Sequence, residues 1–362
     1  MKVLFYVPSI AFGGGESYII NLIKETGEKY QYNIRVLTAC SELYRLLKKL
    51  KFDVKLIATS PSLSPKMFFG LMMLNVEIRK TNPDIVFLNG LPESGAMARF
   101  ILAPNSIKVV VCHSNEYWLN NDTWSIKKLI RKTISSNFLK YLDKVIVITE
   151  EAAKSLRGNN LFRCDLEKIY NGIPLVDIEG SHEVRHPPVF GRISRLCEGK
   201  GNEMLIRATA RIISRGIDVR LVVAGNGEQF ALLKAITIQL GIESNVSFIG
   251  HVEPDSFFSK IDCMVSPSDM EALPTVISEA MSCQIPIIST CVGGVPEMLE
   301  HMVSGYLIPP KDEDKLVEAM IFYLDNKDKF ECYASNAFIS FTNKFSIEAS
   351  TLKTWKFIND RI

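Results

Sequence analysis

The sequence predicts an α/β protein made of two domains, each built on a parallel β-sheet. Short, continuously apolar runs alternate with helical patterns along the whole chain, as in parallel strands that are covered on both faces. A length of 362 residues exceeds one ordinary domain and suits two of about 150–180 residues. The alternation occurs in two rounds, separated at 174–188 by a segment rich in proline and charge, so we expect two Rossmann-like domains.

The apolar runs place the strands, and the segments between them place the helices. In the first half we expect strands at 2–7, 34–37, 54–57, 85–88, 109–112 and 145–148, and a helix at 17–29. In the second half we expect strands at 189–193, 219–224, 246–249, 263–265, 285–289 and 306–308, and helices at 203–215, 228–240 and 315–325. Ligands should bind beyond the carboxyl ends of these strands, where two facing domains would enclose a cleft.

The domain boundaries follow from these elements. We expect a first domain at 1–173, a linker at 174–188 and a second domain at 189–345. The last segment, 346–362, has the pattern of a helix that completes the first domain. Its apolar face is expected to carry Leu352, Trp355 and Ile358.

The charge of the chain is divided unequally between its halves. Residues 1–175 carry 24 Lys and Arg against 15 Asp and Glu, whereas 176–362 carry 18 against 25, although the net charge is only +2. Opposite balances support the two-domain division and indicate that the first half faces something anionic. With 47% hydrophobic and 23% charged residues, two packed cores are feasible and long disorder is not expected.

Composition also narrows the class of protein. No stretch reaches the roughly 18 apolar residues of a membrane-spanning helix, and the start of the chain lacks the pattern of a signal peptide. The eight cysteines are scattered without a CxxC pair, and Cys112, Cys263 and Cys291 lie in apolar runs like core thiols. The five histidines form neither a Ser–His–Asp set nor a metal-ligand spacing. We therefore expect a cytoplasmic protein without a nucleic-acid partner.

Glu271 and Glu279 are the most informative pair of positions. Between them the sequence predicts a loop of three residues, Ala272, Leu273 and Pro274. A helix is expected from Thr275, so one carboxylate would lie in the loop and the other about one turn into the helix. The free N–H groups of such a helix start can hold a phosphate while the carboxylates accept hydrogen bonds from hydroxyls, which indicates a nucleotide sugar. A solvated acidic helix start is the alternative.

Glycines and cations follow two other predicted strands. Gly14 and Gly15 in GGGES follow the first strand, where they would let N–H groups approach a phosphate or simply form a tight turn. Arg195 and Lys200 in GRISRLCEGKG follow the first strand of the second domain. Two cations there could neutralise a diphosphate, although surface loops carry such residues routinely.

Two further strand ends give weaker signals. Gly225 lies in AGNGE, where Phe230 replaces the third glycine of a dinucleotide fingerprint, so a strand-to-helix turn that borders a nucleotide is the better interpretation. His113 ends the run VVVCH and either faces a ligand or is a structural histidine.

Two segments could contact a membrane. The segment 124–144 (WSIKKLIRKTISSNFLKYLDK) predicts a basic amphipathic helix, which either covers the core with a solvated face or docks on an anionic membrane surface. The apolar stretch 67–74, preceded by Pro65 and Lys66, either packs in the core or contacts a lipid acceptor.

Taken together, these residues resemble the retaining glycosyltransferases with two Rossmann-like domains, known as family 4 or glycosyltransferase group 1. Five marks match in order over nearly the whole chain: GGGES, RLxxxKG at 195–201, VAGNGE, the two glutamates, and GGVPE at 293–297. NGI at 171–173 also fits, and the likeness is strongest from 189 to 310. The resemblance implies the GT-B fold.

The resemblance also implies a role for each matching side chain. Glu279 would hold the ribose hydroxyls of the nucleotide, and Glu271 would contact hydroxyls of the donor sugar. Arg195 and Lys200 would stabilise the diphosphate leaving group in place of a metal, so no metal or other cofactor is expected. His113 would lie near the transferred sugar.

Backbone groups complete the implied site. N–H groups at 272–275, a segment whose first residue is most often glycine in the family, would help Glu271 to hold the sugar. Gly14 or Gly15 would approach the diphosphate from the first domain. Whether Arg192 or Arg195 meets the diphosphate stays open, and the LxxxKG spacing favours Arg195.

Three hypotheses about function follow. The first is a retaining transferase that moves a hexose-type sugar from a UDP-, GDP- or ADP-sugar to a hydroxyl of a lipid-linked saccharide or polysaccharide, peripheral at the inner membrane face. The second is a nucleotide-sugar epimerase of the same fold, which would alter its substrate without an acceptor. The third is a transferase-like subunit without turnover, against which the retention of both glutamates argues.

Overall fold

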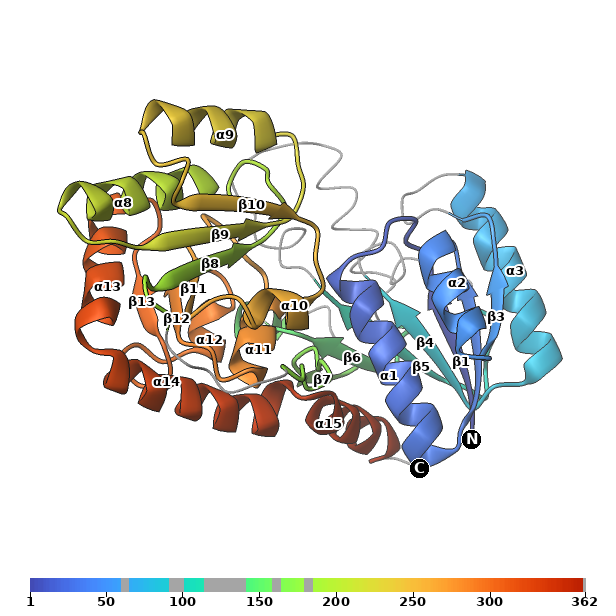
Figure 1. Cartoon of the computed structure of the whole chain (residues 1–362). Coiled ribbons are helices and arrows are strands. Elements are labelled where there is room, and N and C mark those ends of the chain that lie inside the picture. Colours follow the sequence, from blue (N-terminus) through green and yellow to red (C-terminus); the bar gives the residue numbers. More distant parts are fainter. Residues whose placement is uncertain (60–64, 91–100, 114–140, 158–163, 179–184, 361–362) are drawn as a thin grey trace. The chain divides into compact units, whose positions relative to one another are not determined.

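The computed structural model describes residues 1–59, 65–90, 101–113, 141–157, 164–178 and 185–360 (Figure 1). The chain forms two compact units. One comprises Met1–Pro174 together with Ile347–Ile362, and the other comprises Leu175–Ser346. Each unit contains one parallel β-sheet with its own hydrophobic core.

The first unit contains a sheet with the strand order β3-β2-β1-β4-β5-β6-β7. Its strands are β1 (Lys2–Val7), β2 (Asn33–Thr38), β3 (Asp53–Leu56), β4 (Ile85–Asn89), β5 (Ile107–Cys112), β6 (Lys144–Val147) and β7 (Asp165–Lys168). The described helices are α1 (Gly14–Tyr30), α2 (Ser41–Lys49), α3 (Pro65–Thr81), α7 (Glu150–Arg157) and α15 (Ile347–Asn359). Alternate strand side chains pack on α1, α2 and α15 on one face of the sheet and on α3 and α7 on the other.

The second unit contains a sheet with the strand order β10-β9-β8-β11-β12-β13. Its strands are β8 (Val189–Ile193), β9 (Arg220–Ala224), β10 (Val246–Gly250), β11 (Cys263–Ser266), β12 (Ile287–Thr290) and β13 (Tyr306–Ile308). Its helices are α8 (Asn202–Ser214), α9 (Phe230–Gln239), α10 (Pro254–Phe258), α11 (Thr275–Ser282), α12 (Val295–Met298), α13 (Glu313–Asp325) and α14 (Lys327–Ser340), followed by a π-helical turn at Phe341–Phe345.

Every strand predicted from the sequence is present within one or two residues of its expected ends. The prediction missed β7, whose residues DLEK are mostly polar because it is the edge strand next to β6 and buries little of its surface. The apolar stretch 67–74 is part of the longer helix α3.

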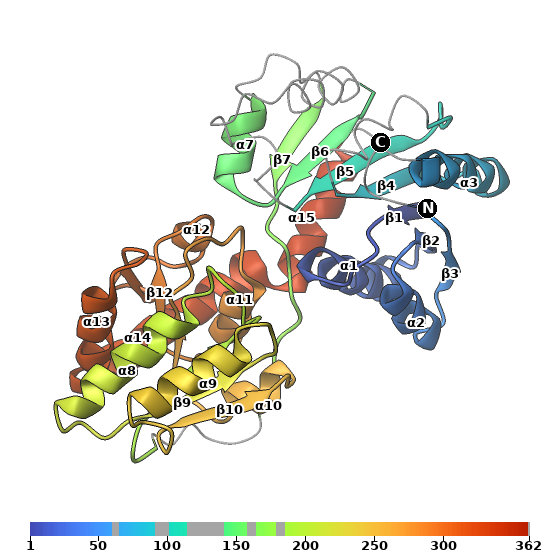
Figure 2. The ribbon, with the colours of Figure 1, turned by 90° about the horizontal axis from the view of Figure 1, so that it is seen from above.

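The last helix packs on the first unit, as Figure 2 shows for α15 beside α1. Trp355 Nε1 donates to Thr26 Oγ1 at 2.8 Å, and Ile358 is fully buried. The expectation for Leu352 was wrong, because its side chain is 62% exposed. The buried stripe of α15 instead runs through Ile347, Ser350, Thr351, Thr354, Trp355 and Ile358, and the small polar members of this stripe allow close approach to α1.

The segment expected as a linker contacts the second unit where it is described. Val176 N–H donates to Ser282 Oγ at 3.4 Å, and Arg185 forms an ion pair with Asp262 at 3.0 Å.

The expectation that Cys291 is a core thiol was wrong: β12 ends at Thr290, and Cys291 is exposed at the start of the following loop. Among the described residues, no helix is long and apolar enough to cross a membrane.

Candidate functional site

The polar residues of the second unit gather where the order of its strands reverses. The chain runs from β8 through β9 to β10 on one side and then crosses back to β11 on the other side of β8, so the order of the strands reverses at β8. In open parallel sheets the carboxyl ends on either side of such a reversal border a ligand-binding crevice. The loop after β8 carries Arg195 and Lys200, and the loop after β11 carries Glu271.

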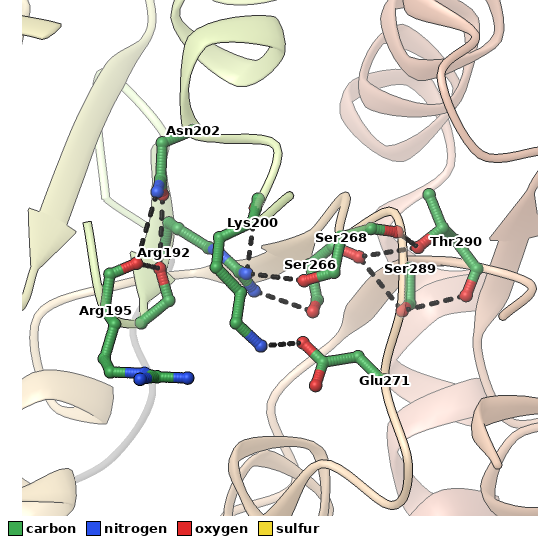
Figure 3. Close-up of polar contacts among 10 residues, drawn as sticks. Arg192, Arg195, Lys200, Asn202, Ser266, Ser268, Glu271, Ser289 and Thr290 are labelled. Carbon is green, nitrogen blue, oxygen red and sulfur yellow. Dashed lines mark hydrogen bonds and ion pairs between the residues drawn. The ribbon is translucent and has the colours of Figure 1, made fainter. Parts of the chain in front are cut away.

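Lys200 and Glu271 are in direct contact at this position. Lys200 Nζ lies 2.8 Å from Glu271 Oε1, and the two side chains are only 22% and 13% exposed (Figure 3). An ion pair that is largely shielded from water is stronger than one on an open surface, although desolvation offsets part of the gain. The structure therefore brings together two residues that the sequence assigns to the diphosphate and the sugar of one donor.

Arg192 lies beneath this pair and has a different role from Arg195. Arg192 is only 1% exposed, and its guanidinium donates to Ser266 Oγ at 2.7 Å, Ser268 Oγ at 2.8 Å and the carbonyl of Lys200 at 3.0 Å. Burial lowers the pKa of Arg192 to about 10, and the Glu271 carboxylate acts in the opposite direction. The group remains a cation at neutral pH and ties the β8–α8 loop to the end of β11.

Arg195 is exposed, in contrast to Arg192. Figure 3 shows the Arg195 guanidinium and the Lys200 ammonium extending in the same direction from the β8–α8 loop. Of the two arginines left open by the sequence, Arg195 is therefore the one whose charge a diphosphate could reach. The two serines that accept hydrogen bonds from Arg192 were not predicted, although their alternate positions at the end of β11 and just beyond it were a usable signal.

The GGVPE segment packs against the Glu271 loop. Gly293 has φ +52°, and a Cβ on it would lie 1.7 Å from the carbonyl oxygen of Glu271. Gly294 N–H donates to the carbonyl of Ala272 at 2.8 Å. Only glycine fits at 293, so this motif supports the backbone of Glu271. Ala272 is not among the described residues with positive φ, so its side chain is compatible with the loop.

Helix α11 begins at Thr275, as the sequence predicts, and follows the loop Ala272-Leu273-Pro274. Pro274 is the N-cap residue, and no side chain caps the helix. Ile277 N–H donates to the Pro274 carbonyl at 3.1 Å, whereas the N–H groups of Thr275 and Val276 precede the first helical carbonyls that could accept from them. Glu279 lies in the second turn and is half-buried. Exclusion of water raises the pKa of Glu279 to about 7, with a smaller contribution from the Glu253 carboxylate. Among the described ion pairs, none involves Glu279.

Gly225 lies in the turn between β9 and α9. Its N–H donates to the carbonyl of Gly250 at 2.7 Å, and at φ +121° a Cβ would lie 1.8 Å from the carbonyl oxygen of Ser194. This glycine allows the turn after β9 to pack closely on the loop after β8, which agrees with the prediction of a strand-to-helix turn.

In the first unit, the ends of neighbouring strands carry a chain of polar side chains around His113. His113 Nε2 lies 2.5 Å from Asn89 Oδ1, and Asn171 Nδ2 lies 3.3 Å from His113 Nδ1. Asn89 Nδ2 in turn lies 3.5 Å from Oε1 of Glu16, a buried carboxylate in the first turn of α1. This pattern fits a neutral imidazole protonated on Nε2, and burial lowers the pKa of His113 to about 4.

The glycines of GGGES border this cluster. Helix α1 begins at Gly14, and a Cβ on Gly15 would lie 3.1 Å from His113 Cδ2. Because both ring nitrogens of His113 are engaged within the unit, this arrangement favours a structural role, and a contact with sugar stays a prediction. Asn89 and Glu16 were not predicted from the sequence. Asn89 could have been found, since it ends β4, the neighbour of β5.

Most of the basic segment 124–144 lies outside the described residues.

Comparison with solved structures defines the class of fold. The chain superposes on HepE of Anabaena, solved in complex with UDP, with a TM-score of 0.83 and 21% identity over 99% of this chain and 100% of that chain. Sucrose-phosphate synthase of Thermosynechococcus elongatus gives a TM-score of 0.77 at 18% identity, covering 99% and 98% of the two chains. The two parallel-sheet units therefore form the GT-B fold of glycosyltransferases.

Two family models match consecutive parts of the sequence. The model described as Glycosyltransferase Family 4 matches residues 12–176, and the one described as Glycosyl transferases group 1 matches residues 177–338. The chain thus belongs to the family 4 glycosyltransferases (group 1), as its motifs predict.

Curated relatives match over part of their length. An uncharacterized glycosyltransferase of Methanocaldococcus jannaschii is 32% identical over 170 residues, which cover 45% of this chain and 43% of that protein. The matches to the first relatives span between about a third and three fifths of their length.

Proposed function

We propose that the chain is a retaining glycosyltransferase that moves a hexose-type sugar from a nucleoside diphosphate to an acceptor hydroxyl. The observation that carries this proposal is the contact between Lys200 and Glu271 at the strand reversal of the second unit. A nucleotide sugar carries a diphosphate next to the sugar, and there a cation for the diphosphate and a carboxylate for the sugar hydroxyls lie side by side.

The leaving group departs with the help of fixed positive charge. The bond between C1 of the sugar and the diphosphate oxygen breaks, and both electrons stay on the diphosphate. Arg195 and Lys200 stabilise the charge that develops, and the buried Arg192 cation holds the Lys200 backbone in place. These cations supply the stabilisation that a divalent metal would otherwise give, so the proposed reaction requires no metal.

The acceptor hydroxyl attacks the oxocarbenium-like C1 from the face that the diphosphate leaves. A new bond from C1 to the acceptor oxygen forms, and the hydroxyl proton passes to a phosphate oxygen. The configuration at C1 is retained because departure and attack use the same face. Glu271 accepts hydrogen bonds from sugar hydroxyls and orients the ring.

The nucleotide is held by α11. Its uncapped first turn offers N–H groups to the phosphates, and Glu279 accepts hydrogen bonds from the ribose hydroxyls. UDP, GDP and ADP remain the candidate nucleotides. The UDP complex of HepE, which shares the fold, is a reason to test UDP-sugars first.

The acceptor is proposed to be a lipid-linked saccharide or a polysaccharide at the inner membrane face. Support comes from the basic balance of the first half and from a relative named phosphatidylinositol N-acetylglucosaminyltransferase gpi3 subunit. That Schizosaccharomyces pombe protein is 36% identical over 149 residues, which cover 39% of this chain and 32% of the relative.

Two measurements test the proposal. Thermal-shift screening with UDP-, GDP- and ADP-sugars should give a rise in melting temperature with one base, because a bound donor stabilises the folded state. With that donor and a soluble acceptor, Glu271→Ala should abolish transfer. Near-normal turnover by Glu271→Ala would show that the site is assigned wrongly, and sensitivity of the wild type to EDTA would contradict the metal-free reaction.

A further inference from the structure

Helix α3 of the first unit is apolar on two faces, and the core uses only one of them. The inner face buries Met67, Leu71, Leu74 and Ile78 against the sheet. Gly70 brings the helix close, because a Cβ there would lie 2.1 Å from Thr59 Oγ1. This close packing fixes the rotation of the helix, so its second apolar face is turned outward.

The outward face carries an exposed apolar stripe. Phe68 is 51% exposed, Phe69 49%, Met72 66% and Val76 42%. Positions 68, 72 and 76 repeat every four residues and follow one side of the helix. In both ribbon views no described element of the unit lies outside α3 (Figures 1 and 2). Single exposed apolar residues are common, but several on one helix face mark an interaction surface.

Cations flank the stripe at both ends. Lys66 precedes it, and Arg79 and Lys80 follow it, all three exposed. The one carboxylate of α3, Glu77, is buried, with Arg35 at 3.0 Å and Lys55 at 2.8 Å. The outward face of α3 therefore presents positive charge around an apolar centre and no negative charge, over a length of about 20 Å.

We propose that the outward face of α3 docks the first unit on an anionic bilayer surface, with the helix lying in the plane of the interface. The Phe, Met and Val side chains enter the boundary between head groups and acyl chains, while the flanking cations contact lipid phosphates. A second copy of the chain fits less well, since antiparallel pairing of two α3 helices would place Lys66 against Arg79 and Lys80.

Co-sedimentation of the full chain with vesicles tests this docking surface. The wild type should bind phosphatidylcholine vesicles that contain phosphatidylglycerol, and binding should fall as salt rises. The double variant Phe68→Ser/Phe69→Ser should lower the partition coefficient at least about tenfold, because two half-exposed rings no longer insert. Neutralising Lys66, Arg79 and Lys80 as glutamines should lower it about fivefold for each charge removed.

Matched controls separate docking from folding and from catalysis. Ile339→Ser/Leu352→Ser removes two apolar side chains of similar exposure, 58% and 62%, outside α3, and should bind vesicles like the wild type. The α3 variants should keep the wild-type melting temperature, and their turnover with a soluble acceptor tests the proposed function separately.

Three results would overturn the docking surface. One is a wild type that does not bind anionic vesicles. Another is binding that survives the Phe variants but is lost when the cations of 124–144 are neutralised, since that segment would then be the anchor. The third is a dimer in solution that the Phe variants dissociate while no vesicle binding occurs.

Discussion

Replacing Glu271 by glutamine tests the ion pair with Lys200, because the change removes the negative charge and keeps the shape. At a separation of 2.8 Å and an effective dielectric constant of about 20, the attraction between the two charges is about 6 kcal/mol. Desolvation and side-chain entropy offset most of this value. A net strength of about 1–2 kcal/mol is reasonable for a pair intermediate between exposed and fully buried.

The expected result for Glu271→Gln is opposite for binding and for turnover. In the wild type, a diphosphate competes with Glu271 for Lys200, and in the variant the competitor is neutral. UDP affinity should therefore rise about 5- to 30-fold, if UDP is the nucleotide that the screen selects. Turnover of the corresponding sugar donor should fall about 10- to 150-fold, the loss expected when a hydrogen bond to a charged group is weakened.

Isothermal titration with UDP and initial rates with the sugar donor measure the two effects. Glu318→Gln is the control, since it removes an exposed ion pair with Lys315 of 2.6 Å and should change neither quantity. A Glu271→Gln protein that binds UDP no more tightly than the wild type refutes the reasoning, because Lys200 would then not be the cation that meets the diphosphate.

Three further outcomes are expected. Because the pKa of Glu279 is about 7 in the folded state and lower when unfolded, this group destabilises the protein as pH rises from about 4.5 to 7. Glu279→Gln should therefore raise the melting temperature at about pH 8 but not at about pH 4. Binding of the nucleotide sugar near pH 7 should release more protons in the wild type than in the variant, as calorimetric titration in buffers of different ionisation enthalpy would reveal. Arg192→Met should lower the free energy of unfolding, measured in urea, by about 3 kcal/mol, because three acceptors lose their donor. Arg195→Met should change that free energy by no more than about 0.5 kcal/mol but should lose turnover. Equal losses of stability in the two variants would contradict the two roles. NMR should show His113 neutral and protonated on Nε2 from about pH 5.5 to 8, and a midpoint near 6.5 would disprove the buried hydrogen-bonded arrangement.

The strands and the start of α11 could be predicted because their signals are local. Continuous apolar runs identify buried parallel strands, and Pro274 followed by a helical pattern identifies the first turn at Thr275. Polar edge strands such as β7 lack this signal, because one edge and much of their surface face water.

Contacts between distant residues could be predicted only in part. The pairing of Lys200 with Glu271 joins loops that follow adjacent strands, so strand order makes it plausible but does not fix the distance. Arg192 lies inside β8, and its burial depends on Ser266 at the end of β11 and Ser268 in the following loop, which no local pattern in VFGRI reveals. Leu352 was misplaced for a related reason, since serine and threonine fill the buried stripe of α15.

The position of α15 has a consequence for how the protein is made. The first unit needs Trp355 and Ile358 in its core, yet these residues follow the whole second unit in the sequence and are synthesised after it. The first unit therefore cannot complete its core before α15 is made, and until then the surface of α1 that α15 covers lacks its partner.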